Sequence, residues 1–216
     1  FGASNGAMDV AMNAHGVGIQ ERLGRPVMSS LHGGWSVGGF TAAGCVALAA
    51  TAGLDPRVES LIVGVGLLLL SLWITRRLGA SSAHSSEGQG LTLPTRPVIL
   101  IGGLCFLVML AEGAIGDWSG IYLRHNTGAS PATAALAFTA FSLGMAIARL
   151  GGDLVNERIG ASTLLRAGTA TVAIALGGVL LIGHTIPAVV GFVLCGLGIA
   201  NAVPLLFSAA GRINPP

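Results

Sequence analysis

The sequence predicts an all-α fold, a polytopic membrane helix bundle of about seven spans. Charged residues make up 9% of the 216-residue chain, whereas a soluble domain carries about 25%. Hydrophobic residues make up 52%, and they fall into runs that approach the roughly 20 residues needed to cross the hydrocarbon layer. So few charges cannot cover the surface of a water-soluble protein of this size. We therefore expect the chain to lie in a bilayer.

Seven apolar segments of spanning length follow one another along the chain. Prolines mark five of their starts, where a missing backbone N–H costs little. These prolines are Pro26, Pro56, Pro97, Pro131 and Pro187. The expected spans are residues 1–19, 27–53, 58–78, 97–123, 131–155, 163–183 and 187–208. The three cysteines, Cys45, Cys105 and Cys195, all stand in apolar runs, which predicts small buried thiols and no disulfide framework.

The longest polar connection, residues 79–96, has the Ser/Gly composition of a flexible linker. It separates three expected spans in residues 1–78 from four in residues 97–216. Eight arginines follow the odd-numbered spans and two follow the even-numbered spans, which places the linker in the cytoplasm by the positive-inside rule. The first span then runs inward without an initiator Met. We therefore expect an internal piece of a longer protein or a truncated gene product.

A polar stripe marks the first span. Asn5, Asp9 and Asn13 are four residues apart, so they share one helix face. A carboxylate within hydrocarbon is unfavourable unless it faces protein or water. We favour a cavity in front of this stripe. The alternative is a structural network that hydrogen-bonds neighbouring helices.

The second span carries a smaller polar face. Ser29, His32 and Ser36 fall within about 60° of one another at 3.6 residues per turn, next to Trp35. A histidine in this position can titrate or hydrogen-bond a hydroxyl group of a solute. The simpler alternative is a histidine whose ring satisfies a local hydrogen bond.

Two carboxylates interrupt the fourth expected span. Counted from Pro97 at 1.5 Å per residue, Glu112 lies roughly 22 Å and Asp117 roughly 30 Å into the membrane. Asp117, Trp118 and Tyr122 are therefore expected at the outer interface, where charges and aromatic residues are common. Glu112 remains inside the hydrocarbon layer.

Glu112 is the first candidate for proton transfer. Burial disfavours the charged form of a carboxylate, so a buried glutamate can load and release a proton in each cycle. Asp9 is the competing candidate. Alternatively, Glu112 caps backbone groups at a bend that neighbouring glycines allow.

Small residues and a late proline predict close packing and a kink. Ladders of small residues let helix backbones approach closely. Near the cytoplasmic end of span five, Arg149 precedes Asp153 by one turn, so we expect these two to pair. Pro204 should kink span seven and free carbonyls that its neighbours must satisfy. The ladders are Gly34, Gly38 and Ala42 in span two, and Ala140, Gly144, Ala148 and Gly152 in span five.

Four stretches of the chain resemble the major facilitator superfamily of membrane transporters. They are DVAMNAHGVGIQERLGRPVMSSLHGGWSVGG, AEGAIGDWSGIYLR, ARLGGDLVNERIG and GLGIANAVPLLFSAAGR. Within the superfamily they look most like its bacterial YbjJ-like and fucose-permease-like branch. The resemblance implies that the seven spans are helices four to ten of twelve. It also implies that spans two and five face each other across the cytoplasmic entrance.

One signature of the superfamily is matched in part. Its cytoplasmic loop motif reads Gly-x-x-x-Asp-Arg-x-Gly-Arg-Lys, and Glu157, Arg158 and Gly160 match the centre. Asp153 stands where the first Gly belongs, and Ala161 with the next residue replaces the last basic pair. The resemblance implies a gating role for this loop. The alternative is an ordinary basic turn.

These features predict a secondary active transporter that moves a small polar solute by alternating access, with proton coupling. The expected partners are the solute, protons, the lipid bilayer of the cell (inner) membrane, and the remaining helices of the same transporter. No cofactor, metal or nucleic acid is expected, and a net charge of +2 gives no case for the last. The alternatives are a non-transporting scaffold or sensor and an intramembrane hydrolase built on Ser119. The hydrolase motif lacks its first glycine.

Overall fold

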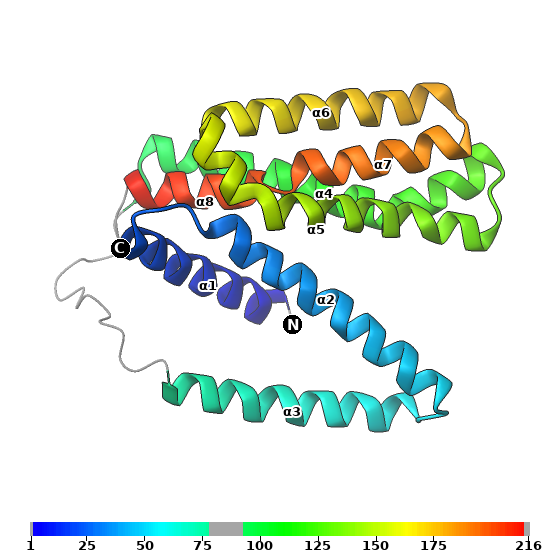
Figure 1. The fold of residues 1–216 in the computed structure, drawn as a ribbon, viewed down its shortest axis with the longest axis horizontal. Coiled ribbons are helices and arrows are strands. Elements are labelled where there is room, and N and C mark those ends of the chain that lie inside the picture. Colours follow the sequence, from blue (N-terminus) through cyan, green and yellow to red (C-terminus); the bar gives the residue numbers. More distant parts are fainter. Residues whose placement is uncertain (1, 78–92, 214–216) are drawn as a thin grey trace. The chain divides into compact units, whose positions relative to one another are not determined.

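The computed structural model describes residues 2–77 and 93–213, without the side chains of Asn5 and of several residues between 43 and 51. This part of the chain is all-α, as the composition predicts (Figure 1). Its helices are α1 (Gly2–Leu23), α2 (Met28–Thr51), α3 (Pro56–Arg77), α4 (Arg96–Thr127), α5 (Pro131–Ile159), α6 (Ala161–Ile182), α7 (Thr185–Ile199) and α8 (Ala202–Ile213).

Five helical segments of the described residues are long and apolar enough to cross a membrane. They are α3, α4, α5, α6, and α7 continued by α8. The chain is therefore built as a multi-pass membrane protein. The first two expected spans form α1 and α2, which have 22 and 24 residues but do not belong to these five. In α1, Asp9, Asn13 and His15 lower the apolar character of the middle of the helix.

Local signals explain where the helices begin and end. Ser130 accepts a hydrogen bond from the N–H of Thr133 at 3.2 Å, directly before Pro131 opens α5. Asp55 does the same for the N–H of Arg57 at 2.7 Å, at the start of α3. Such caps satisfy N–H groups that have no partner within the helix. Glycines with positive φ end several helices, where a side chain would be strained; they are Gly24, Gly53, Gly128, Gly160 and Gly183.

The described residues pack as two compact units, which we treat separately. The larger unit holds the chain up to Ser36 and from Pro94 onward, so it contains α1, the first turns of α2, and α4 to α8. The smaller unit begins at Val37 and contains the rest of α2 and α3. Most of the expected linker, residues 79–96, lies outside the described residues. The predicted domain boundaries therefore stay a prediction.

In the larger unit, α7 lies between α5 and α6 and contacts both (Figure 1). Phe141 of α5 and Phe192 of α7 are buried in the shared core. A Cβ atom on Gly196 of α7 would collide with the carbonyl oxygen of Phe141, so this contact requires glycine. Of the three cysteines, only Cys195 is buried there, whereas Cys105 is half-buried and Cys45 is exposed.

The packing divides the α5 ladder between two neighbours. A Cβ on Gly144 would collide with the carbonyl of Val193, so this part of the ladder, including the buried Ala140, packs on α7. A Cβ on Gly152 would collide with Ser29, so the other end of the ladder does contact α2. Gly34 of α2 is exposed, with nothing near its missing side chain. The neighbouring Gly33 contacts α5 instead. A four-residue spacing identifies a helix face but does not say which helix covers it. Gly38 lies in the smaller unit.

The seventh expected span is interrupted near the predicted place. Helix α7 ends at Ile199 and α8 begins at Ala202. Because Pro204 has no backbone N–H, it cannot bond the carbonyl of Ala200 four residues earlier. The helical hydrogen bonds resume with the N–H of Leu205, which donates to Asn201 at 3.1 Å.

Candidate functional site

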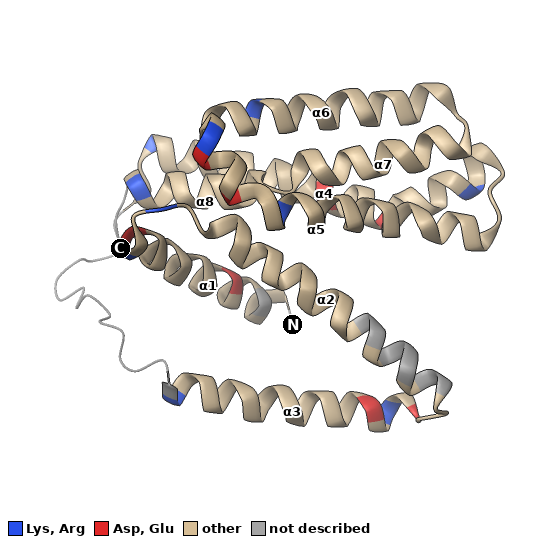
Figure 2. Ribbon diagram, viewed as in Figure 1, with Lys and Arg blue, Asp and Glu red and all other residues tan. Residues whose placement is uncertain are grey.

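Charged residues in the described helices lie mostly near helix ends, with a few within the helices (Figure 2). Among the latter, Arg149 of α5 and Glu112 of α4 form an ion pair, with 3.6 Å between the Nη2 and Oε1 atoms. Ionisable side chains inside membrane segments face the protein interior and pair with one another. This ion pair is therefore the starting point of the candidate site.

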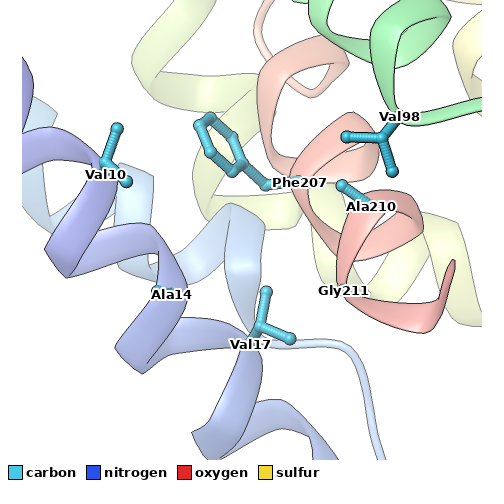
Figure 3. A pocket seen from close by; sticks show the side chains of 7 residues that line it. All are labelled: Val10, Ala14, Val17, Val98, Phe207, Ala210 and Gly211. Atoms are coloured by element: carbon cyan, nitrogen blue, oxygen red, sulfur yellow. The ribbon is translucent and has the colours of Figure 1, made fainter. Parts of the chain in front are cut away.

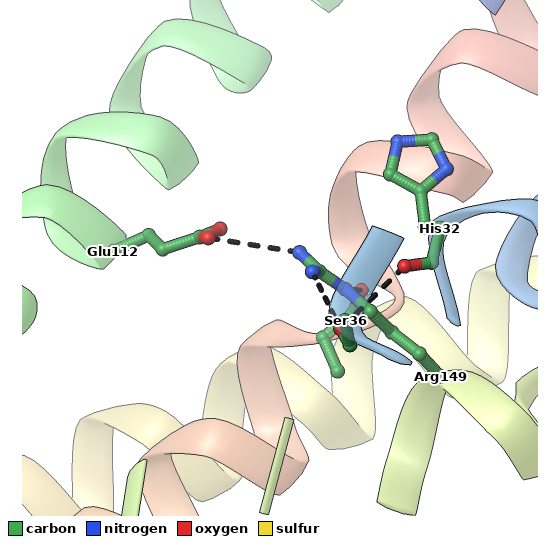
Figure 4. A network of polar contacts seen from close by, with 5 residues as sticks. His32, Ser36, Glu112 and Arg149 are labelled. Atoms are coloured by element: carbon green, nitrogen blue, oxygen red, sulfur yellow. Dashed lines mark hydrogen bonds and ion pairs between the residues drawn. The ribbon is translucent and has the colours of Figure 1, made fainter. Parts of the chain in front are cut away.

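Arg149 uses all three sides of its guanidinium group (Figure 4). Its Nε donates to the carbonyl of Ala200 at 3.3 Å, and its Nη1 donates to Ser36 Oγ at 3.3 Å. The third contact is the ion pair with Glu112. One side chain thus joins α2, α4, α5 and the break between α7 and α8.

The carbonyl oxygen of Ala200 can accept a hydrogen bond from Arg149 because of a proline four residues later. Pro204 frees the Ala200 carbonyl, and a free carbonyl inside a membrane protein needs a partner. The Nε of Arg149 supplies that partner. This contact confirms the prediction that neighbours satisfy the carbonyl groups freed by the proline.

The predicted pairing of Arg149 with Asp153 is wrong. The carboxylate of Asp153 instead accepts the backbone N–H groups of Ser29 at 3.0 Å and Ser30 at 2.7 Å. These amides belong to the first turn of α2, which has no helical acceptor for them. Two charge-assisted hydrogen bonds at a helix N-terminus are strong, so Asp153 is held by α2 and Arg149 is free to contact Glu112.

His32 and Ser36 lie on the face of α2 that contacts α5, as their spacing predicts. Ser36 accepts the hydrogen bond from Arg149. His32 is buried, and its Nδ1 lies 3.0 Å from the carbonyl of Met28. His32 therefore has the local hydrogen bond of the simpler alternative, and it lies on the helix turn next to Ser36 (Figure 4).

The polar stripe of α1 is partly described. Asn13 is only 1% exposed, and its Nδ2 donates to the backbone oxygen of Asp9 at 2.9 Å and to its Oδ1 at 3.2 Å. The Oδ1 of Asn13 is buried without a partner among the described residues. Asp9 is half-buried. The side chain of Asn5 lies outside the described residues.

Asn201 was missed by the sequence analysis. It is buried in the break between α7 and α8, where its Nδ2 donates to the carbonyl of Ala148 at 3.2 Å. Its Oδ1 is a second buried oxygen without a partner in the described part of the chain. The signal was present, because an asparagine three residues before a proline inside an apolar span stands where backbone bonds are lost.

The remaining candidates lie at the ends of helices or on the surface. Asp117 is exposed on α4, and Glu157 and Arg158 are exposed in the last turn of α5. The hydroxyl of Tyr122 donates to the carbonyl of Val179 in α6 at 2.7 Å, and its location at the outer interface stays a prediction. The helix α4 runs without interruption for 32 residues past Glu112 and the glycines that follow it.

Two cavities flank α8. One is apolar, holds about 220 Å³ and lies between α1, α4 and α8 (Figure 3). The other is polar and holds about 290 Å³. Gln20 lines the polar cavity and accepts hydrogen bonds from the N–H of Val27 at 3.2 Å and the hydroxyl of Ser208 at 3.3 Å. These contacts tie α1 to α8. The residues that line the apolar cavity are Val10, Ala14, Val17, Val98, Phe207, Ala210 and Gly211.

Three known proteins are similar to this chain along nearly its whole length. It is 36% identical over 212 residues to an uncharacterized MFS-type transporter of Yersinia pestis, covering 98% of the chain and 55% of that protein. It is 37% identical over 215 residues to the uncharacterized transporter y4wD of Sinorhizobium fredii, covering 97% and 56%. It is 31% identical over 216 residues to the membrane protein MosC of Rhizobium meliloti, covering 99% and 52%.

The chain spans about half the length of the curated relatives it matches. No family model matches the chain, and no solved structure does. Two of the three relatives carry the word transporter in their names, and the third is named a membrane protein. These names agree with the apolar helices of this chain.

Proposed function

We propose that this chain is part of a secondary active transporter of the major facilitator type, which moves a small solute by alternating access. Similarity to two proteins named as transporters, over 97–98% of the chain, supports this proposal. In this proposal the helices correspond to helices four to ten of twelve in the YbjJ-like and fucose-permease-like branch. The protein lies in the inner membrane of a bacterial cell.

The observation that carries the proposal is the ion pair of Arg149 with Glu112. The exposed fractions of these side chains are 7% and 32%. A charged pair is an expensive way to hold apolar helices together, because removing both groups from water costs more than their attraction often returns. A solute pathway gives the pair a reason to exist, since functional sites inside membranes are where such residues are kept.

In this proposal, Glu112 carries the coupled proton. Arg149 is the counter-ion of Glu112 while the pair is intact. A conformational change that separates the two groups would leave the carboxylate in an apolar site, where it takes up a proton. Asp9 remains the second candidate, with Asn13 as its observed partner.

The substitution Glu112→Gln tests this role in the full chain reconstituted into proteoliposomes. The solute is first identified by thermal stabilisation with a panel of sugars, amines and drugs. Because glutamine keeps the size but cannot titrate, the variant should lose uphill accumulation driven by a pH gradient and keep exchange down a concentration gradient. Glu21→Gln, at an exposed position near the end of α1, is the matched control.

Unchanged accumulation and an unchanged pH profile in Glu112→Gln would move the proton role to Asp9 or remove it. A scaffold or sensor is the competing function. Such a protein would show no saturable solute uptake in proteoliposomes. Its binding to partners would not change on substitution of Asp9, Glu112 or Arg149.

A further inference from the structure

We propose that the transported solute carries a carboxylate group, which Arg149 binds in the place that Glu112 occupies in this structure. The inference rests on the proposed transport function and names the chemical class of the solute. Two contacts fix the guanidinium group of Arg149, its contact with Glu112 is the longest of the three, and the buried positive charge needs a counter-ion.

Two sides of the guanidinium group of Arg149 are fixed by neutral acceptors. The Ala200 carbonyl accepts from Nε and the Ser36 hydroxyl accepts from Nη1, both at 3.3 Å. Because the group is planar, these two contacts set the direction of the remaining Nη2 side (Figure 4). Arg149 is therefore held in place even when its third partner leaves.

The contact with Glu112 is the looser one. Its 3.6 Å separation exceeds the roughly 2.7–2.9 Å of a charge-assisted hydrogen bond. The two side chains also differ in access, with 7% of Arg149 exposed against 32% of Glu112. Glu112 is therefore the less buried and less tightly held member of the pair, and in our proposal it is the one that the solute displaces.

The other charged groups nearby are held by other partners, so they cannot replace Glu112 as the counter-ion of Arg149. Asp153 of α5 is bound by two amides of α2. Asp9 of α1 is engaged by Asn13, and the Nδ1 of His32 lies against the carbonyl of Met28. If Glu112 left alone, Arg149 would be a buried charge without a counter-ion, which is strongly unfavourable. A neutral sugar cannot supply that charge, whereas a carboxylate can.

The exchange is balanced in charge and atoms. The incoming carboxylate forms hydrogen bonds with the Nη2 side of Arg149, and the bond between Arg149 and Glu112 is lost. The freed Glu112 carboxylate takes one proton from a hydronium ion of the solution, so one O–H bond of hydronium breaks, one O–H bond of Glu112 forms and a water molecule is released. One solute anion and one proton therefore enter together, and the net charge of the site is unchanged. The predicted mode is electroneutral symport of a monocarboxylate with a proton.

Infrared difference spectroscopy on the purified full chain tests the inference without knowledge of the natural solute. Formate is the probe, because it is the smallest carboxylate and enters any site that accepts one. Its neutral isostere formamide is the control. Saturating formate should produce a carboxylic acid band from protonated Glu112, and formamide should not. The band should be absent in Glu112→Gln and present in Glu21→Gln.

Direct formate binding, measured by calorimetry, separates the two residues of the pair. Glu112→Gln should still bind formate, because Arg149 is intact, and this binding should no longer depend on pH. Arg149→Lys keeps a positive charge but loses the planar donor pair, so its affinity should fall about 10- to 100-fold, the range for one or two hydrogen bonds to a charged group.

The two experiments distinguish a failure of the carboxylate site from a failure of the transporter function. If formate and formamide behave alike, or if saturating formate leaves Glu112 ionised, the carboxylate site is overturned, even when the protein transports a neutral solute. If formate protonates Glu112 but no solute of any class is accumulated in proteoliposomes, the anion site stands and the transporter proposal fails.

Discussion

At the scale of single residues, Asp153 shows how one carboxylate can organise two helices. It belongs to α5, yet both of its oxygens accept N–H groups from the first turn of α2. The α2 sequence opens with Met28, Ser29 and Ser30, and neither serine caps its own helix in these contacts. The N-terminal cap of α2 is thus supplied by a residue more than 120 positions later in the chain.

The substitution Asp153→Ala should destabilise the protein by about 1–3 kcal/mol, because it leaves two buried amides without acceptors. Asp153→Asn keeps one acceptor oxygen and should lose less. The measurement is the midpoint of denaturant unfolding for the purified chain. Asp117→Asn removes an exposed carboxylate on α4 and should leave the midpoint unchanged. Equal midpoints for Asp153→Ala and Asp117→Asn would contradict the capping role.

The residues of the candidate site were easier to predict than their partners. Helical periodicity alone placed Ser29, His32 and Ser36 on one face, because that is a local property. The partner of Arg149 was mispredicted, since the neighbouring carboxylate at position 153 seemed sufficient. Only the tertiary structure shows that the α2 amides bind Asp153 and that Glu112 lies across from Arg149.

At the scale of helices, the break between α7 and α8 supplies an acceptor for the network. Pro204 leaves the Ala200 carbonyl free, and Arg149 bonds to it. Asn201 in the same break donates to the Ala148 carbonyl of α5. The interruption therefore joins two helices through hydrogen bonds that a regular helix would not offer.

The substitution Pro204→Ala should repair the helix, because the new N–H can donate to the Ala200 carbonyl. Backbone amide exchange should slow across residues 200–206, and the Nε of Arg149 should lose its acceptor. Hydrogen exchange measured by mass spectrometry checks this. Pro187→Ala adds an N–H in the first turn of α7, where no helical acceptor exists, so it should not change protection. Unchanged exchange across 200–206 would show that other contacts cause the break.

Helix contacts through glycine give a second prediction at this scale. Gly144→Ala should destabilise the protein by about 1–3 kcal/mol, because its Cβ would collide with the carbonyl of Val193 on α7. Gly34→Ala is the matched control, since nothing lies near its missing side chain and alanine favours a helix by up to about 1 kcal/mol. Thermal unfolding checks both variants. A tolerated Gly144→Ala would show that α5 and α7 separate easily.

Helix positions followed well from the sequence, and helix neighbours did not. Proline and glycine act within one or two residues, so the predicted starts of α3 to α7 fall within about two residues of the observed ones. Contacts between helices depend on the whole bundle. The α5 ladder was therefore correctly seen as a packing face, but only its Gly152 end contacts α2, whereas Gly144 packs on α7.

At the scale of the whole molecule, the direction of the chain through the membrane is predicted by its arginines. Helices α4, α5 and α6 follow one another, and α4 and α5 are each of spanning length. Asn126 lies in the last turn of α4 and Ser162 in the first turn of α6. Both are exposed, and α5 separates them by 29 residues, or roughly 43 Å at 1.5 Å per residue. The two positions should therefore lie on opposite sides of the membrane.

Cysteine labelling in intact cells tests this arrangement in a background from which Cys45, Cys105 and Cys195 have been removed. A cysteine at position 162 should react only after the cytoplasm becomes accessible, because the nearby Arg158 and Arg166 mark the cytoplasmic side. A cysteine at position 126 should react with an impermeant reagent from outside. A third probe, at Ser85, lies in the linker outside the described residues and should react only from the cytoplasm. Labelling of 162 and not 126 from outside would reverse the orientation. Labelling of both from one side would mean that α5 does not span the bilayer.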